Sequence, residues 1–139
     1  MSVDRPVGVP EGFERTSARG PFTAVNGPIW RKTVGNGALP LFGLLPEERH
    51  TNGLGFMHGG MVATFLDSAM AQAIFEKFGT RLVTLEFSVT FLHVVMKGRW
   101  CEAQVTLGAP IENRITAQVD MVSRGQVCAQ GRGIFQLFP

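Results

Sequence analysis

The longest regular pattern in the chain is helical and runs from His58 to Phe78. Apolar residues recur there at spacings of three and four, and Gly79 follows as a stop signal. Polar residues fall at every fourth position and form a narrow stripe, made of Thr64, Ser68, Gln72 and Glu76. The pattern predicts one long helix that is buried over most of its surface.

The chain after this helix alternates between apolar and polar residues, which is typical of strands in a sheet with one buried face. From Arg81 to Leu92 the odd positions are apolar, and the even positions, including Thr84 and Glu86, are polar. The same alternation recurs in three later segments, 101–107, 115–121 and 127–137. Short turn-prone connections separate the segments, so we expect an antiparallel meander with one apolar and one polar face.

The pattern before the helix is weaker. Residues 1–27 show neither helical nor alternating periodicity, and six of the eight prolines lie within the first 46 residues. We therefore expect an N-terminal arm over 1–27. Short strands are predicted at Ile29–Val34 and Leu39–Leu45, separated by a turn at Gly35–Gly37.

A long apolar helix followed by a one-faced antiparallel sheet has a simple packing solution, in which the sheet curls around the helix and buries it. The sequence thus predicts an α+β fold. So small a sheet leaves its edge strands open, and pairing with a second copy would cover them. Charged residues make up only 17% of the chain, against about 25% in typical soluble domains, which also favours at least a dimer.

Composition narrows the class of protein further. The 139 residues, 45% of them hydrophobic, suit one compact domain, and a net charge of +2 without basic runs argues against nucleic-acid binding. Cys101 and Cys128 do not have the spacing of metal ligands, so we expect no zinc site and a reducing compartment. The chain shows no membrane span or signal peptide, and we expect a cytoplasmic protein.

The segment that could carry chemistry runs from Asn52 to Gly60 and leads directly into the helix. Gly59 and Gly60 stand together at the helix start, although glycine costs roughly 1 kcal/mol relative to alanine inside a helix. The first N–H groups of a helix lack internal partners and can donate to a developing oxyanion. The alternative is that the glycines only permit a tight turn into the helix.

Asp67 is one of three aspartates and lies within the apolar helix, beyond the edge of its polar stripe. If buried, it would have a raised pKa and could serve as a base; if exposed, it only adds solubility. His58 and Thr84 also have ordinary structural interpretations, as a first-turn histidine and a strand threonine.

These residues together resemble the hotdog-fold thioesterase superfamily. The pattern is Asn52, then His58 with Gly59 and Gly60, then Asp67, followed by Val83 with Thr84 and Phe91 with Leu92. It is most similar to the branch of phenylacetic-acid-pathway thioesterases and small acyl-CoA thioesterases. The resemblance implies a hotdog domain over 28–139, with a curved antiparallel sheet wrapped around one long central helix. Residues 1–27 match nothing in it.

The resemblance also implies a reaction, the hydrolysis of acyl-CoA thioesters to free acid and CoA without a metal or cofactor. Gly59, with Gly60 beside it, would polarise the thioester carbonyl, and Asp67 would act as nucleophile or general base. Asn52 would hold the carbonyl or the water, Thr84 would orient the water, and His58 would have a secondary role at the turn. The active sites would lie across the subunit interface of a homodimer or homotetramer.

Four residues are expected to bind substrate: Gly60, already named beside Gly59, and Glu86, Phe91 and Arg114, the last through a CoA phosphate. Ordinary solvated charge is the alternative for each basic residue at the turns, where Lys97, Arg99 and Arg124 are also candidates. The segment His93–Met96 lacks the proline that family members often carry, so we expect the mouth of the coenzyme channel to differ from theirs.

Other functions on the same fold stay open at this point. A non-hydrolytic acyl-CoA binding or sensing module is the first, a dehydratase or hydratase of 3-hydroxyacyl thioesters the second, and an inactive structural subunit the third. Acyl specificity is also open, because the helix rotation decides which of Phe65, Met70 and Phe75 lines a pocket.

Overall fold

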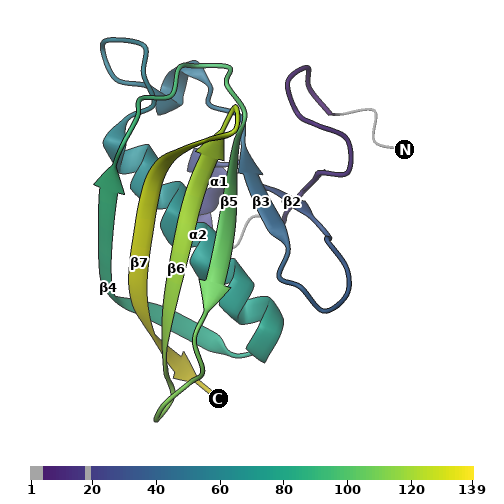
Figure 1. Ribbon diagram of the computed structural model, residues 1–139, viewed down its shortest axis with the longest axis vertical. Coiled ribbons are helices and arrows are strands. Elements are labelled where there is room, and N and C mark those ends of the chain that lie inside the picture. The colour runs from purple at the N-terminus through teal and green to yellow at the C-terminus, as the bar shows by residue number, and fades with distance from the viewer. Residues whose placement is uncertain (1–4, 18–19) are drawn as a thin grey trace.

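The computed structural model describes residues 5–17 and 20–139. Within them, one seven-stranded antiparallel sheet curves around the helix α2, as Figure 1 shows. In chain order the elements are β1 (Glu14–Arg15), α1 (Pro21–Asn26), β2 (Trp30–Lys32), β3 (Leu41–Leu44), the 3₁₀ helix η1 (Glu48–His50), α2 (Gly59–Phe78), β4 (Arg81–Phe91), β5 (Cys101–Leu107), β6 (Arg114–Ser123) and β7 (Gln126–Phe138). This arrangement confirms the predicted α+β hotdog fold.

The strand order β1-β2-β3-β5-β6-β7-β4 differs from the predicted meander at one point. β5, β6 and β7 follow one another as expected, but β4 pairs with β7 and leaves β5 to pair with β3. The segment between β4 and β5 does not turn back as a hairpin. It crosses to the loop before α2 instead, where Met57 N donates to Val95 O at 2.7 Å and Lys97 N donates to Gly55 O at 3.4 Å.

The predicted central helix is confirmed at both ends. His58 is its N-cap, and Gly79 ends it in the left-handed conformation, with φ of 68°. The helix packs against β4, β5, β6 and β7. Its buried side chains form most of one wall of the core; they are Met61, Val62, Phe65, Leu66, Ala69, Met70, Ala73 and Ile74.

A bulge in β4 changes which side chains face α2. The pairing with β7 shifts by one residue between Thr84 and Glu86. Phe87 and, before the bulge, Leu82 both pack on the core, whereas Leu85 is 44% exposed. The expectation that odd positions alone face inward along all of β4 is therefore wrong. The bulge turns Thr84, expected on the polar face, toward α2.

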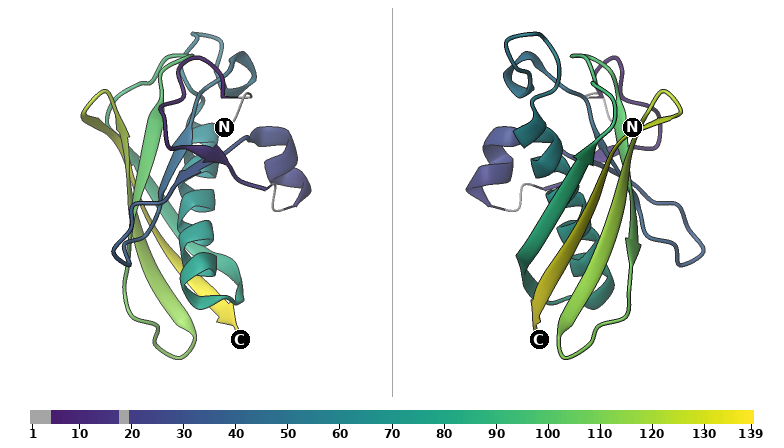
Figure 2. Two further views of the ribbon diagram at one scale, coloured as in Figure 1. Left: turned by 90° about the vertical axis from the view of Figure 1, so that its right-hand side faces the viewer. Right: turned by 60° about the vertical axis from the view of Figure 1, so that its left-hand side comes forward.

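The N-terminal segment wraps around the β1 edge of the sheet. Val9 and Phe13 pack with Trp30 in a small cluster on the face away from α2, since Leu41 and Leu45 join that cluster and the intervening β3 residues join the main core. β1 then pairs with β2 at the sheet edge, and α1 follows on the same side of the sheet as α2 (Figure 2). The segment thus reaches both faces of the sheet.

Candidate active site

The carboxylate of Asp67 lies on α2, half-buried beside β4. Thr84 Oγ1 donates a hydrogen bond of 2.8 Å to Asp67 Oδ1. Burial raises the pKa of Asp67 above its ordinary value, and the hydrogen bond from Thr84 opposes part of that rise. A carboxylate with a raised pKa and one oxygen held in place is suited to accept a proton.

The start of α2 presents a backbone donor. His58 Nδ1 accepts from Gly60 N at 2.8 Å, and His58 O accepts from Met61 N and Val62 N. Among the described residues, Gly59 N–H has no acceptor. Of the two glycine N–H groups considered above, that of Gly60 is thus engaged by the cap, and that of Gly59 is available to a ligand.

The two glycines differ in what surrounds them. A Cβ at Gly60 would lie 3.0 Å from His58 Nδ1, so a side chain there would disturb the cap. A Cβ at Gly59 would meet only the Phe91 ring, at 3.5 Å. Gly59 is therefore exposed beside an aromatic side chain, and Phe91 itself is 56% exposed.

Asn52 organises the loop that leads to this helix start. Its Oδ1 accepts from Leu54 N at 2.9 Å and from Phe56 N at 3.2 Å, and its own N–H donates to Phe56 O at 2.8 Å. These bonds use the side-chain oxygen inside the loop. The geometry makes Asn52 a residue that holds the loop, with its Oδ1 committed to backbone donors.

Four of the five catalytic residues expected from the sequence fall into two groups on one chain, and the fifth, Asn52, lies in the loop before α2. Asp67 and Thr84 form the first group. His58 and Gly59 form the second, together with Phe91, which was expected to bind substrate. Gly59 and Asp67 are eight residues apart on α2, about 12 Å along the helix axis at 1.5 Å per residue. Both groups cannot touch one carbonyl within a single chain.

Glu86 and Arg114 lie away from these groups. Glu86 is exposed next to the core residue Phe87, and Arg114 is exposed next to the buried Ile115, so each points to the face of the sheet opposite α2. Arg114 Nε donates to Gln136 Oε1 at 3.2 Å on that face. The structure does not bring either residue to Asp67.

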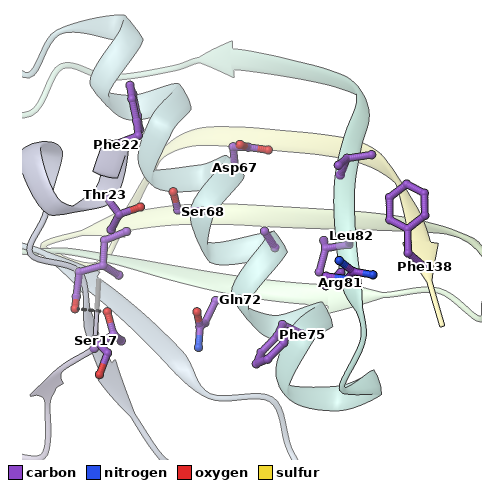
Figure 3. A pocket seen from close by; sticks show the side chains of 14 residues that line it. Ser17, Phe22, Thr23, Asp67, Ser68, Gln72, Phe75, Arg81, Leu82 and Phe138 are labelled. Carbon is purple, nitrogen blue, oxygen red and sulfur yellow. Dashed lines mark hydrogen bonds between the residues drawn. The ribbon is translucent and has the colours of Figure 1, made fainter. Parts of the chain in front are cut away.

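A cavity of about 730 Å³ lies along the outward side of α2, between α1 and the first residues of β4 (Figure 3). Asp67 is on its wall. The other lining residues are Thr16, Ser17, Phe22, Thr23, Ile29, Ser68, Ala71, Gln72, Phe75, Arg81, Leu82, Val83 and Phe138. Ser68 and Gln72 belong to the polar stripe of α2. That stripe was the only feature of the sequence that indicated the side of α2 on which this cavity lies.

His50 holds the C-terminal end of α1, the helix whose residues Phe22 and Thr23 border this cavity. His50 Nδ1 accepts from Glu47 N at 3.0 Å, so its Nε2 carries the proton and donates to Asn26 O at 2.8 Å. Arg49 also donates to Val25 O and Gly27 O. Burial lowers the pKa of His50, a residue that is only 2% exposed. Sequence reasoning did not single out His50, because its partner lies 24 residues away.

The described residues offer little basis for metal or thiol chemistry. Across 5–17 and 20–139, no group of three His, Cys, Asp or Glu side chains is arranged to hold a metal ion. Both cysteines are buried, and burial raises the pKa of Cys101 to about 12, so it is a poor nucleophile. No helix in this part of the chain is long and apolar enough to cross a membrane.

Comparison with known proteins shows the family to which this chain is similar. The family described as Thioesterase superfamily matches residues 54–128, more than half of the chain. The matched range includes every residue of the two groups above, namely His58, Gly59, Asp67, Thr84 and Phe91.

Individual proteins similar to this chain share between a quarter and a third of its residues over the aligned part. A candidate esterase of Pseudomonas aeruginosa is 26% identical over 93% of this chain and 97% of its own length. Acyl-coenzyme A thioesterase 13 of Mus musculus is 30% identical over 62% of this chain, and the match spans 64% of that protein, just under two thirds. A Bacillus halodurans protein solved with CoA has a TM-score of 0.65 at 26% identity, covering 70% of this chain and 66% of that one.

Proposed function

Because this chain belongs to the Thioesterase superfamily, we propose that it hydrolyses acyl-CoA thioesters to a free acid and coenzyme A. The similarity to an acyl-coenzyme A thioesterase and to a protein solved with CoA supports this substrate class. The chemistry rests on Asp67 as the base and on the N–H of Gly59 as the donor to the thioester carbonyl.

The observation that carries the proposal is the position of these two groups at opposite ends of one edge strand. Thr84, near the start of β4, contacts Asp67, and Phe91, at its end, lies beside Gly59. β4 is the last strand of the sheet, with one side unpaired in the single chain. Val83 on this strand is 47% exposed.

Antiparallel pairing of β4 with the β4 of a second copy would unite the two groups. Such pairing sets the Thr84 end of one strand opposite the Phe91 end of the other. Asp67 would then face the partner subunit's Gly59, and a symmetric dimer would hold two complete sites. The same pairing would cover the open edge and the exposed apolar side chains along it.

The reaction at such a site is a balanced hydrolysis. The partner subunit's Gly59 donates its N–H to the carbonyl oxygen, at the positive end of a helix, where negative charge develops. Asp67 takes a proton from a water molecule as that water attacks the carbonyl carbon. Collapse of the tetrahedral intermediate breaks the C–S bond, and the departing CoA thiolate takes up the proton from Asp67.

The assignment of general base to Asp67 follows from its surroundings. Thr84 holds one carboxylate oxygen, and the cavity on whose wall Asp67 lies is open to solvent, so water can reach the site. The raised pKa of Asp67 makes it a stronger base than an exposed aspartate. Thr84 is thus a positioning residue that orients Asp67.

Thiol release from a panel of CoA thioesters tests the proposal directly. The panel comprises acetyl, hexanoyl, palmitoyl, phenylacetyl and hydroxybenzoyl CoA, with wild-type protein beside Asp67→Asn. We expect turnover by the wild type and a loss of about 10²–10⁴-fold in kcat for Asp67→Asn, the usual contribution of a general base. Binding without turnover by the wild type would assign the chain to acyl-CoA sensing instead.

A further inference from the structure

The cavity beside Asp67 carries an arrangement of charge that thioester hydrolysis does not require. Among its lining residues in the described part of the chain, Asp67 is the only acidic side chain and Arg81 the only basic one. Three phenyl rings, those of Phe22, Phe75 and Phe138, share the wall. In the view of Figure 3, Arg81 on β4 lies between Phe75 and Phe138, and Asp67 lies nearer the N-terminus of α2.

The guanidinium of Arg81 has no hydrogen-bond acceptor among the residues that the structure describes. Within the described residues its guanidinium makes neither an ion pair nor a side-chain hydrogen bond. Arg31, the arginine that contacts α2, is different, because it binds Glu76 through Nε and Nη2 at 2.7–3.0 Å. The free guanidinium of Arg81 is therefore available to a ligand in the cavity, whereas that of Arg31 is committed to the fold.

The spacing of Arg81 from Asp67 suits the two ends of one acyl group. Arg81 precedes Thr84 by three residues on β4, which is about 10 Å along a strand. Thr84 marks the position of Asp67, where the thioester carbonyl would react. The wall between these points includes Leu82 and Val83, so a chain that leaves the carbonyl passes apolar side chains before it reaches the guanidinium.

We propose that Arg81 binds a carboxylate at the far end of the acyl chain, so that the preferred substrate is the CoA monothioester of a medium-length dicarboxylic acid. The inference rests on the proposed function and names the substrate class of that same site. A guanidinium pairs with a carboxylate through two parallel hydrogen bonds. An acyl chain without this group would leave Arg81 to water alone.

The nucleotide end of CoA fits this cavity poorly. Its phosphates carry several negative charges, whereas the lining residues that the structure describes offer one cation, three phenyl rings and the carboxylate of Asp67. A single carboxylate on an apolar chain matches that composition better. A cavity of about 730 Å³ also exceeds what a short acyl group would occupy.

The test compares two substrates of equal chain length, suberoyl-CoA and octanoyl-CoA, which differ in the terminal carboxylate. For wild-type protein we expect a higher kcat/KM with suberoyl-CoA. Arg81→Gln should lower the ratio of the two kcat/KM values about tenfold, equal to about 1.4 kcal/mol, through the KM for suberoyl-CoA. Its kcat/KM for octanoyl-CoA should stay within about twofold, and Arg81→Lys should restore part of the preference.

Arg132→Gln is the matched control. Arg132 is an exposed arginine on β7, between the buried Gly131 and Gly133, and it is not part of the cavity wall. Its loss removes the same charge from the protein at a site on the opposite face of the sheet. The substrate ratio of this variant should equal that of the wild type.

Two results would overturn the proposal. Equal kcat/KM for both substrates in wild type and Arg81→Gln would show that no terminal carboxylate is recognised. An equal rise in KM for both substrates, with weaker inhibition by free CoA, would assign Arg81 to the CoA phosphates instead.

A binding measurement separates this proposal from the proposed function. Non-hydrolysable thioether analogues of the two substrates are titrated calorimetrically into wild type and Arg81→Gln. Tighter binding of the suberoyl analogue that depends on Arg81 supports the inference even if no thioester is hydrolysed. Hydrolysis of octanoyl-CoA with no preference in binding would leave the proposed function standing and contradict the role of Arg81.

Discussion

The hydroxyl of Thr84 donates a 2.8 Å hydrogen bond to Asp67, which joins the edge strand β4 to the central helix α2 across 17 residues of sequence. The contact depends on the bulge next to Thr84, because an unbroken alternation would send this side chain to the outer face of the sheet. One shifted residue in β4 thereby supplies the carboxylate with its partner.

Thr84→Val should shift the pH dependence of hydrolysis. The hydrogen bond from Thr84 lowers the pKa of Asp67 against the effect of burial, so its removal raises that pKa further. The acidic limb of the kcat/KM profile should move to higher pH, since a larger share of Asp67 is then protonated at a given pH. Thr84→Ser retains the hydroxyl and should keep the limb near its wild-type position. An unmoved limb in Thr84→Val would separate Asp67 from the titrating group.

Asp67→Asn should stabilise the fold at neutral pH while it abolishes activity. Burial raises the folded-state pKa of Asp67 above its unfolded value, so the stability linked to its protonated form is present below the unfolded pKa and lost as pH rises through the folded one. The amide removes this loss. Urea unfolding at pH 7 should give the variant a higher midpoint than the wild type, and the difference should shrink at acid pH.

His50 should make the fold sensitive to mild acid. Burial lowers its folded-state pKa below the unfolded value, so the fold loses stability as pH falls through the unfolded pKa, near 6.5. Protonation of Nδ1 would also remove the acceptor of Glu47 N. Urea unfolding at pH 7.5 and 5.5 should show this loss in the wild type.

His50→Phe is the comparison for that measurement. The variant leaves the former partners of the ring, Glu47 N and Asn26 O, without their bonds, and it should cost about 1–3 kcal/mol of unfolding free energy at pH 7.5. Its stability should change less between the two pH values than that of the wild type. An equal acid loss in both proteins would assign the effect to other groups.

The features of the fold that could be predicted from the sequence are those that depend on residues close together in the chain. The bounds of α2 were predictable because His58 and Gly79 act within one turn of the helix ends. The position of β4 in the sheet was not predictable. It depends on where the segment around Val95 crosses, and that segment is held by a hydrogen bond from Met57, which is distant in the sequence. Local alternation carries no information about such a crossing.

The same reasoning applies to the site. Gly59, Asp67 and Thr84 could be selected from their pattern, and the structure shows the bond between the last two. The wall formed by α1 could not be predicted, since this six-residue helix is held by His50 and Arg49 from outside its own sequence. Arg81 carried no signal either, because only the fold places it on the cavity of Asp67.

Gly59→Pro should remove the proposed oxyanion donor without breaking α2. Gly59 is the first residue of the helix, where proline is well tolerated, and His58 already has the extended conformation that proline requires of the residue before it, with φ of −62° and ψ of 137°. We expect kcat to fall about 10²–10³-fold, as when one oxyanion donor is lost, with little change in the melting temperature. Gly59→Ala retains the N–H and should keep most of the activity. Equal losses in both variants would point to crowding against Phe91 as the cause.

Mixed dimers should show whether the two groups act across subunits. Asp67→Asn and Gly59→Pro chains should each retain no more than about 1% of wild-type activity when tested alone. The two proteins are unfolded together in urea and refolded at equal concentration. If Asp67 works with the partner subunit's Gly59, a mixed dimer holds one intact site and one doubly altered site. Random assortment makes about half of the dimers mixed, so the refolded sample should recover about a quarter of wild-type activity.

The alternative is that both groups act within one chain, although their separation of about 12 Å along α2 argues against it. In that case every site in the mixture carries a substitution, and no activity returns. Wild-type protein carried through the same refolding sets the scale for the recovered fraction.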